Sequence, residues 1–468
     1  MGYSSVNCTT AAGGGCNCSA TVNQAGGIGV VSASASMSGN FTTSGNTLTT
    51  DSSTPYSYCA SGGKLTLTPE APTTGTVVLQ GAGTGTTGSG GATGGAGAGG
   101  GRGGSTGAGG GAGGAGGAAG AGGAGTAGST GAGGSPVTFQ GPCDIYAAGA
   151  TPTPCVAAYS TTRLLSSKYS GPLYQVRMGG SNLGTGGTLK DIGLIAGGVF
   201  ADGPAQDAFC GTSACTISKL YDQSGKGNDL TVEGAGCYVT TPDNEANAKG
   251  HSLTASGHKV YALYSVSVSN GEHDGYRNDT ATGLPLGTAA QGVYEVVDGT
   301  RSNTGCCWDF GSARRDNCYY DGTGTMDTIF FGKSFWMTGA GNGPWFMADF
   351  EGGVWTGGSA KTAAGQNTTD PSVTWDYAFG VVKTNTVNNT PQWAMRVGDG
   401  QSGGLTTAYD GQAPATWNLQ GAVVLGTGGD NSNGSFGTFF EGAITAGRPS
   451  DATDLAVQQN VQAAGYGK

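Results

Sequence analysis

The stretch WFMADFEGGVW, residues 345–355, places two acids two positions apart in an apolar and aromatic run. Side chains alternate between the faces of a β-strand, so a strand here puts Phe346 and Phe350 on one face and Asp349 and Glu351 on the other. The plain interpretation is a pair of exposed acids on a solvated sheet. The other is catalytic, because apolar walls perturb the pKa of an acid. Large apolar neighbours favour the second interpretation: Trp345, Met347 and Trp355.

Glycoside hydrolysis suits such a site, because it needs two carboxylates and neither a metal nor a cofactor. The chain has only three His, which weakens the competing Ser-His-Asp chemistry of esterases. A partner acid is available in VVLGTGGDNSNGS, where an apolar run enters a glycine-rich turn that displays Asp430. Acids are also ordinary turn residues. Glu441 in FFEGAIT is the rival acid, although it could be structural.

Two adjacent cysteines, Cys306 and Cys307, stand in the stretch GCCWDF. A bond between neighbouring cysteines requires a distorted peptide and gives a compact, rigid, apolar surface against which a sugar ring could rest. The alternative is that each cysteine bonds to a separate partner, with Cys237 and Cys318 available. Residue types alone leave both possibilities open.

The composition indicates a secreted protein that acts on a neutral substrate. Charged residues make up 11% of the chain and the net charge is −10, which argues against nucleic acid or an anionic membrane as partner. The chain contains no run of about 18 apolar residues, which is the length needed to span a bilayer. Twelve cysteines without C-x-x-C spacing predict disulfides and an oxidising location rather than a metal site. No signal peptide is visible at the given start.

Composition divides the chain into three parts. Residues 1–80 predict a small β module with two hairpins, in SGNFTTSGNTLTT and YSYCASGGKLTLTP. Disulfides could staple this module, whose role as a structural cap or as a carbohydrate- or surface-binding unit stays open; its cysteines are Cys8, Cys16, Cys18 and Cys59. Residues 81–138 are rich in Gly, Ala, Ser and Thr and predict a disordered, flexible tether.

Residues 139–468 predict an all-β catalytic domain. Short β-like runs follow one another, among them GPLYQVRMGG, QGVYEVVDG, DTIFFGKSFWM and GTFFEGAIT. Helical periodicity is scarce until RPSDATDLAVQQNVQAAG, where Ser450 or Asp451 is a candidate N-cap. Many short strands with one helical tail favour a two-sheet sandwich of the lectin-like (LamG-like) jelly-roll type.

Several blocks in order resemble the α-L-arabinofuranosidase B catalytic domain, glycoside hydrolase family 54. They are GPCDIYAAGATPTPCVAAYSTTRLL, LYDQSGKGNDL, GPWFMADFEGG and LGTGGDNSNG, and the resemblance runs from about Gly141 to the C-terminus. It implies a β-sandwich that removes single terminal α-L-arabinofuranosyl residues from arabinan or arabinoxylan side chains with retention of configuration. It implies no cofactor, and we expect a monomer.

The resemblance also assigns roles to residues. Glu351 of the D-x-E motif matches the nucleophile, and Asp430 matches the general acid/base. Substrate-binding positions map to Cys306, Cys307, Trp336, Asp349, Gly352, Gly353 and Gly429. The implied disulfides are Cys143–Cys155, Cys210–Cys215 and Cys306–Cys307. Three departures stand out: Gly352 replaces a common Asn, no arabinose-binding β-trefoil precedes the end at Lys468, and Cys237 and Cys318 have no evident counterpart.

Two other functions compete with this hypothesis. A non-catalytic lectin on the same sandwich would use Glu351 and Asp430 only to bind sugar hydroxyls. A surface or matrix protein would use the glycine-rich segment to space two adhesive modules.

Overall fold

The computed structural model describes the backbone of seven strands between residues 2 and 80, and residues 139–468 except 150, 238, 268–272 and 319–321. The chain forms two compact units, Met1–Pro136 and Val137–Lys468. The predicted tether, residues 81–138, lies outside the described residues. None of the described helices has the length and apolar character needed to cross a membrane.

The first unit contains a hairpin of β1 (Gly2–Thr10) and β2 (Cys16–Asn23), and a separate five-stranded antiparallel sheet. That sheet follows chain order: β3 (Phe41–Ser44), β4 (Thr47–Thr50), β5 (Pro55–Ser61), β6 (Lys64–Pro69) and β7 (Val77–Gln80). Both predicted hairpins are confirmed, as β3–β4 and β5–β6. The disulfides suggested for this module concern side chains outside the described part of the structure.

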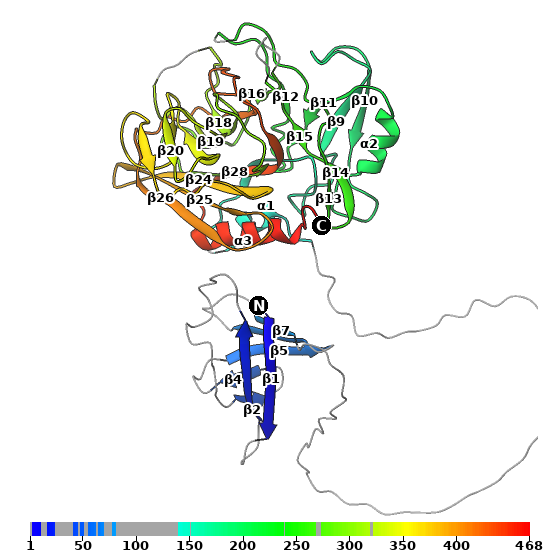
Figure 1. The fold of residues 1–468 in the computed structure, drawn as a ribbon, viewed down its shortest axis with the longest axis vertical. Coiled ribbons are helices and arrows are strands. Elements are labelled where there is room, and N and C mark those ends of the chain that lie inside the picture. The colour runs from blue at the N-terminus through cyan, green and yellow to red at the C-terminus, as the bar shows by residue number, and fades with distance from the viewer. Residues whose placement is uncertain are drawn as a thin grey trace, which may run out of the picture. The chain divides into compact units, whose positions relative to one another are not determined.

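The second unit is mostly β, as predicted, and its larger sheet has ten strands (Figure 1). In sheet order they are β10 (Thr188–Ile192), β9 (Tyr174–Met178), β11 (Cys215–Leu220), β12 (Leu230–Val232), β16 (Tyr276–Asn278), β27 (Ala422–Leu425), β18 (Asp309–Ala313), β19 (Asp327–Gly332), β21 (Trp345–Asp349) and β22 (Val354–Trp355). Every neighbouring pair in it is antiparallel.

A seven-stranded antiparallel sheet forms the second layer. Its strands are β15 (Leu263–Tyr264), β28 (Thr438–Ala446), β17 (Gln291–Asp298), β24 (Tyr377–Val387), β25 (Thr390–Asp399) and β26 (Leu405–Gln412), with β8 (Cys155–Ser160) also paired to β28. Two small pairs complete the unit: β13 (Ser252–Ala255) with β14 (His258–Tyr261), and β20 (Met337–Gly339) with β23 (Gly365–Asn367).

The two layers pack face to face through aromatic side chains. The ring centroids of Phe310 in β18 and Phe439 in β28 lie 5.1 Å apart. A β-carbon on Gly380 of β24 would lie 2.5 Å from Phe346 of β21, so this close approach between the layers requires glycine. Phe346 and Phe350 are fully buried, which confirms the predicted core face of the WFMADFEGGVW stretch.

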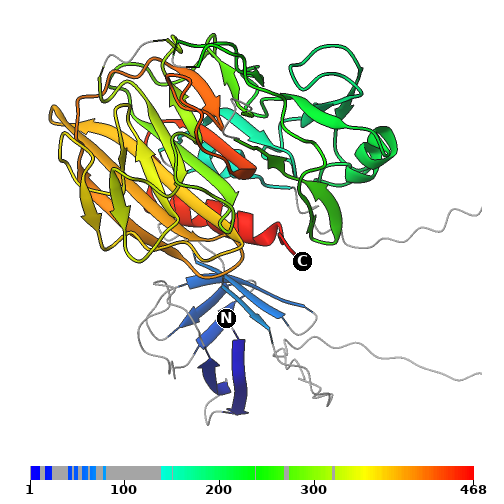
Figure 2. The same cartoon turned by 45° about the horizontal axis from the view of Figure 1, so that its top comes forward.

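Among the described residues, three helices lie outside the sheets: α1 (Pro142–Ala147), α2 (Gly203–Cys210) and α3 (Asp451–Ala463). The side chain of Ser450 caps α3 by accepting the backbone N–H of Thr453 at 3.1 Å, which settles the predicted choice of N-cap. The helix runs along the outer face of the sheet containing β24 and β25 (Figures 1 and 2). Because α1 and α2 are short, helical periodicity did not predict them.

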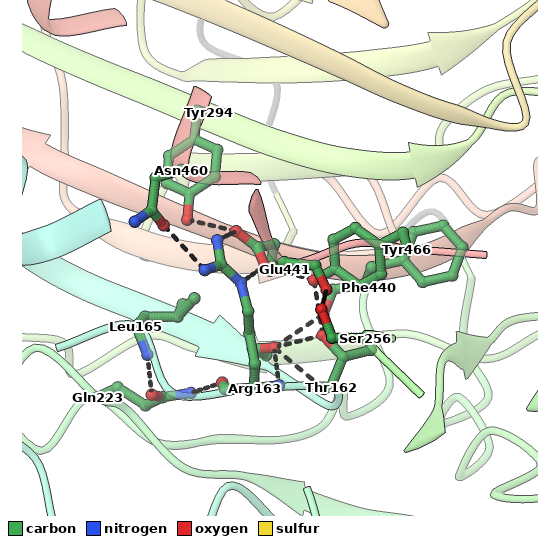
Figure 3. A network of polar contacts seen from close by, with 12 residues as sticks. Thr162, Arg163, Leu165, Gln223, Ser256, Tyr294, Phe440, Glu441, Asn460 and Tyr466 are labelled. Carbon is green, nitrogen blue, oxygen red and sulfur yellow. Dashed lines mark hydrogen bonds and ion pairs between the residues drawn. The ribbon is translucent and has the colours of Figure 1, made fainter. Parts of the chain in front are cut away.

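A buried polar network joins the chain's last strand and helix to the start of the unit (Figure 3). Arg163 donates from Nε to Glu441 Oε2 at 2.5 Å and from Nη2 to Oε1 at 2.7 Å. The hydroxyls of Tyr466 and Tyr294 donate to the same carboxylate, and Asn460 of α3 accepts from Arg163. Glu441, the rival catalytic acid, is therefore fully committed to structure.

Four disulfides lie in the described part of the second unit. Cys143–Cys155 connects α1 to β8, and Cys210–Cys215 connects the end of α2 to β11. Cys306 is bonded to Cys307, and Cys237 is bonded to Cys318 across a sequence separation of 81. The sequence left open whether Cys306 and Cys307 bond to each other or to separate partners, and these two disulfides show that they bond to each other.

Candidate active site

The two acids of the WFMADFEGGVW stretch lie where a strand ends and the chain reverses. β21 stops at Asp349, and β22 returns beside it so that Asp349 pairs with Val354. Positive φ angles at Glu351 (73°), Gly352 (77°) and Gly353 (139°) make this tight reversal possible. Glycine adopts such angles without steric cost, whereas Glu351 holds one as a non-glycine residue.

The prediction that Asp349 and Glu351 share the open face of one strand is therefore wrong. Glu351 lies beyond the strand, and both acids are buried, with exposed fractions of 5% and 4%. The reversal keeps them together, because the backbone N–H of Glu351 donates to Asp349 Oδ1 at 2.8 Å. The alternative of two solvated surface acids is excluded by the same burial.

Asp430 is held in a compact turn that follows β27. The N–H of Gly428 donates to the carbonyl of Ser432 at 2.8 Å, and the N–H of Ser432 donates to Asp430 Oδ1 at 3.0 Å. β27 pairs with β18, which pairs with β19, and β19 pairs with β21. Two strands, β18 and β19, therefore lie between β27 and β21, so the Asp430 turn and the Glu351 reversal meet through the loops that follow β27 and β21.

The turn lies directly against the side chain of Glu351. A β-carbon on Gly429 would lie 2.9 Å from Oε2 of Glu351 and 2.7 Å from Sδ of Met326. Glycine is therefore needed at position 429 for a contact between the turn and a carboxylate rather than for its backbone angle. Asp430, the next residue, is half-buried.

A buried arginine supports the turn from behind. Arg277 of β16 donates from Nη1 to the carbonyl of Gly429 at 2.9 Å, and the same nitrogen lies 3.4 Å from Glu233 Oε1. The side chains of Arg277 and Glu233 are 3% and 0% exposed. Burial raises the pKa of Glu233 to about 7, although the charge of Arg277 acts in the opposite direction.

A second buried contact anchors the far side of the same turn. Asn433 donates from Nδ2 to Asp243 Oδ1 at 3.2 Å, and Nδ1 of His273 lies 2.9 Å from Asp243 Oδ2. Asp243 and His273 are almost fully buried. Sequence reasoning did not find these residues, because they come from loops with no motif.

The cysteine doublet and an indole form apolar walls next to the acids. Sγ of Cys307 lies 3.5 Å from Asp349 Oδ2, and the N–H of Cys307 donates to the carbonyl of Ser432 at 3.3 Å. Trp336 packs against the small cluster that contains the doublet and Trp345. The doublet thus touches both the Asp349 side and the Asp430 side of the site.

These elements enclose a cavity of about 470 Å³. All nine residues predicted from the sequence line it: Cys306, Cys307, Trp336, Asp349, Glu351, Gly352, Gly353, Gly429 and Asp430. Three further lining residues, Met326, Phe335 and Ser432, were missed. Ser432 and Phe335 adjoin predicted residues or motifs, whereas Met326 carries no signal in its sequence context.

The buried carboxyl groups in and near the cavity influence one another. Burial raises the pKa of Asp349 to about 7, the N–H of Glu351 opposes this rise, and the charge of Asp430 adds to it. Burial also raises the pKa of Asp309 in β18 well above its usual range, with Asp349 and Glu351 adding to the rise. Asp349 and Asp309 therefore retain protons at a pH where isolated carboxyls are ionised.

One group in the described residues has the proximity expected of metal ligands. A sulfur of Cys306, a sulfur of Cys307 and a carboxylate oxygen of Asp349 lie within 4.8 Å of one another. The two sulfurs are bonded to each other, so neither can act as a thiolate ligand.

A family model described as "Alpha-L-arabinofuranosidase B, catalytic" matches residues 142–467. The chain belongs to the α-L-arabinofuranosidase B family. The match covers nearly all of the second unit and includes every residue that lines the cavity.

Curated relatives of the family agree with this assignment. The chain is 44% identical over 339 residues to a probable α-L-arabinofuranosidase B of Aspergillus fumigatus, covering 70% of this chain and 62% of that protein. It is 45% identical over 336 residues to an α-L-arabinofuranosidase of Hypocrea jecorina, covering 70% of this chain and 63% of that protein. The chain thus spans less than two thirds of these relatives' lengths.

Solved structures of the family have the same fold. One is a mutant of a GH54 α-L-arabinofuranosidase soaked with 4-nitrophenyl α-L-arabinofuranoside, with a TM-score of 0.64 and 41% identity over 70% of this chain and 66% of that chain. Another is an arabinofuranosidase complexed with arabinofuranosyl-α-1,2-xylobiose, with the same TM-score, identity and coverage. These neighbours fit the β-sandwich described above.

Proposed function

We propose that this protein is a retaining, exo-acting α-L-arabinofuranosidase. One observation carries the proposal: Glu351 and Asp430, distant in sequence, line one cavity, and the residue before Asp430 is in contact distance of the Glu351 carboxylate. Two carboxyl groups facing one small cavity match the requirements of glycoside hydrolysis. Family membership and the names of the relatives give the substrate class, a terminal α-L-arabinofuranosyl residue.

The reaction proceeds by two displacements. The Glu351 carboxylate attacks the anomeric carbon while Asp430 gives its proton to the departing glycosidic oxygen, so the glycosidic bond breaks as an ester bond to Glu351 forms. Asp430 then removes a proton from water, which attacks the anomeric carbon and releases the sugar from Glu351. Retention requires these two carboxyl groups to lie about 5–5.5 Å apart.

The other cavity residues hold the sugar. Asp349, with its raised pKa, can carry a proton near neutral pH and donate it in a hydrogen bond to a ring hydroxyl. The Cys306–Cys307 pair and Trp336 offer apolar surfaces to the C–H faces of the ring. Gly352, Gly353 and Gly429 leave room for the ring and offer backbone groups to its hydroxyls. A narrow pocket of this kind favours removal of single terminal residues.

The biological setting follows from the same assignment. The substrates are arabinose-containing polysaccharides and oligosaccharides such as arabinan and arabinoxylan side chains. The four disulfides support secretion into an oxidising environment. We also propose a lectin-like jelly-roll topology for the sandwich, a monomeric enzyme, and a tether over residues 81–138 after the β module of residues 1–80.

The deciding experiment measures release of nitrophenol from 4-nitrophenyl α-L-arabinofuranoside by the full chain, its Glu351→Gln variant and its Asp430→Asn variant. Wild type should turn over, and Glu351→Gln should lose activity by at least about 10³-fold because the covalent route is removed. Exposed Asp376→Asn serves as the matched control. Saturable arabinose binding without turnover would instead identify a lectin, and undiminished turnover by Glu351→Gln would exclude this mechanism.

The stereochemistry gives an independent check. In the first seconds of hydrolysis, proton NMR should show the α anomer of arabinose before mutarotation. Azide should restore turnover of the Asp430→Asn variant on the nitrophenyl substrate, because a small anion can replace the water that Asp430 activates. Initial release of the β anomer would contradict the retaining assignment.

A further inference from the structure

The cavity has an exposed aromatic side chain at its edge that the proposed mechanism does not use. Phe335 lines the cavity and is 65% exposed. Four other large apolar side chains among the described residues are similarly exposed, but none of them lines the cavity: Leu183, Leu189, Leu286 and Val387. A single exposed apolar side chain is ordinary on a protein surface, but Phe335 stands where a ligand in the cavity can cover it.

Phe335 stands in a loop that hydrogen bonds hold, and its ring contacts that of Trp336. It lies between β19 and β20, where the hydroxyl of Ser334 accepts the backbone N–H groups of Trp336 at 2.9 Å and Met337 at 3.4 Å. Its ring centroid is 4.1 Å from that of Trp336, with 33° between the planes. The N–H of Lys333 donates to the carbonyl of Asn303 at 3.0 Å, which fixes the start of the loop. Two adjoining rings therefore line the cavity from its wall to its edge.

The cavity is larger than one furanosyl residue needs. An arabinofuranosyl group with its glycosidic oxygen has ten non-hydrogen atoms, which would fill about 300 Å³ even at the roughly 30 Å³ that each water molecule occupies in the liquid. The cavity measures about 470 Å³. The remaining space can hold part of the group to which the arabinose is attached.

We propose that Phe335 is the binding platform for the sugar that carries the terminal arabinofuranosyl residue. This inference rests on the proposed function. Glu351 and Cys307 are buried whereas Phe335 is exposed, so the leaving group extends toward the edge of the cavity where Phe335 lies. A pyranose of the xylan backbone presents an apolar C–H face that packs on an aromatic ring and covers it from water.

We therefore expect Phe335 to affect the choice between substrates more than the rate at which the glycosidic bond is cleaved. Contact with a sugar remote from the reacting bond can be used to orient that bond, so it increases kcat/KM only for substrates that possess the remote sugar. A substrate whose leaving group is a methyl group gains nothing from Phe335. Trp336, deeper in the cavity, contributes to both substrates.

The test compares Phe335→Ala with wild type on two substrates, an arabinofuranosyl-xylobiose and methyl α-L-arabinofuranoside. Loss of the ring should reduce kcat/KM by about tenfold on the oligosaccharide and by less than about twofold on the methyl glycoside. Phe335→Tyr, which keeps the aromatic face, should retain wild-type preference. Leu286→Ala removes a similarly exposed side chain elsewhere and is the matched control.

The outcomes separate the platform from the enzyme assignment. Equal losses on both substrates, or no loss on either, with wild type active on both would overturn the platform and leave the proposed function intact. Failure of wild type to cleave either substrate would overturn the proposed function and the platform with it. A loss confined to the oligosaccharide and restored by Phe335→Tyr supports the platform.

Discussion

Gly429 and Glu351 are in such close contact that a β-carbon on the glycine would lie 2.9 Å from Oε2 of the glutamate. The contact joins the turn after β27 to the reversal after β21, and it connects the proposed general acid/base with the proposed nucleophile. Their relative position is therefore set by van der Waals contact in addition to the sheet.

Gly429→Ala should reduce activity much more than stability. The atoms that the new methyl group meets, Glu351 Oε2 and Met326 Sδ, belong to side chains that can move aside, so folding is preserved while the nucleophile is displaced. A misplacement of this size can reduce kcat by about 10²-fold. Gly404→Ala, where a β-carbon meets nothing within 4 Å, is the control. Wild-type kcat in Gly429→Ala would show that the contact is unimportant.

Arg277 is a positioning residue for Asp430, because it donates to the carbonyl of Gly429 without lining the cavity. Arg277→Met should weaken proton donation by Asp430. A methyl leaving group needs that proton and a 2,4-dinitrophenolate does not, so kcat/KM on the methyl glycoside should fall at least about tenfold further than on the dinitrophenyl glycoside. Arg277→Lys keeps a positive charge near Glu233, so its loss of activity should lie between those of wild type and Arg277→Met. Equal losses on both substrates would reduce Arg277 to a support of the fold.

Removing one partner from the network of Figure 3 should destabilise the folded protein strongly. Arg163→Met leaves the fully buried carboxylate of Glu441 without its cation, which costs about 3–5 kcal/mol in unfolding free energy. Lys259→Met removes a cation from an exposed pair with Asp207 and should cost at most about 1 kcal/mol. Urea denaturation of both variants measures the difference. Similar losses in the two would contradict the assigned role of burial.

Asp370 should make the protein less stable as pH rises. Burial raises its pKa from 3.8 to about 9, and neither of its carboxyl oxygens has a hydrogen-bond partner among the described residues. Between these pH values the folded state keeps a proton that the unfolded state has lost, so stability decreases with increasing pH. Asp370→Asn removes this dependence and should gain up to about 1.4 kcal/mol per pH unit relative to wild type between pH 5 and pH 8.

Urea denaturation at pH 5, 6.5 and 8 checks this prediction, with the exposed Asp376→Asn as control. The advantage of Asp370→Asn should increase steadily with pH. A constant difference across the range would mean that Asp370 ionises normally in the folded protein.

Local physical chemistry accounts for what could be predicted from sequence. Short runs rich in β-branched and aromatic residues indicate β17, β19 and β28, and the hydroxyl of Ser450 begins α3, because strand propensity and helix caps depend on residues near one another in the chain. The blocks around Glu351 and Asp430 were recognisable because each is one contiguous segment.

Only tertiary structure decided how these segments meet. The end of β21 at Asp349 and the burial of both acids depend on β22 folding back beside it, which alternation within the stretch does not encode. The pairing of Cys237 with Cys318, the support of Gly429 by Arg277 and the exposure of Phe335 each depend on the approach of distant segments. The sequence therefore determined which side chains could do the chemistry. Packing between the strands determined that these side chains share one cavity, because contacts between distant segments form only when the whole sandwich closes.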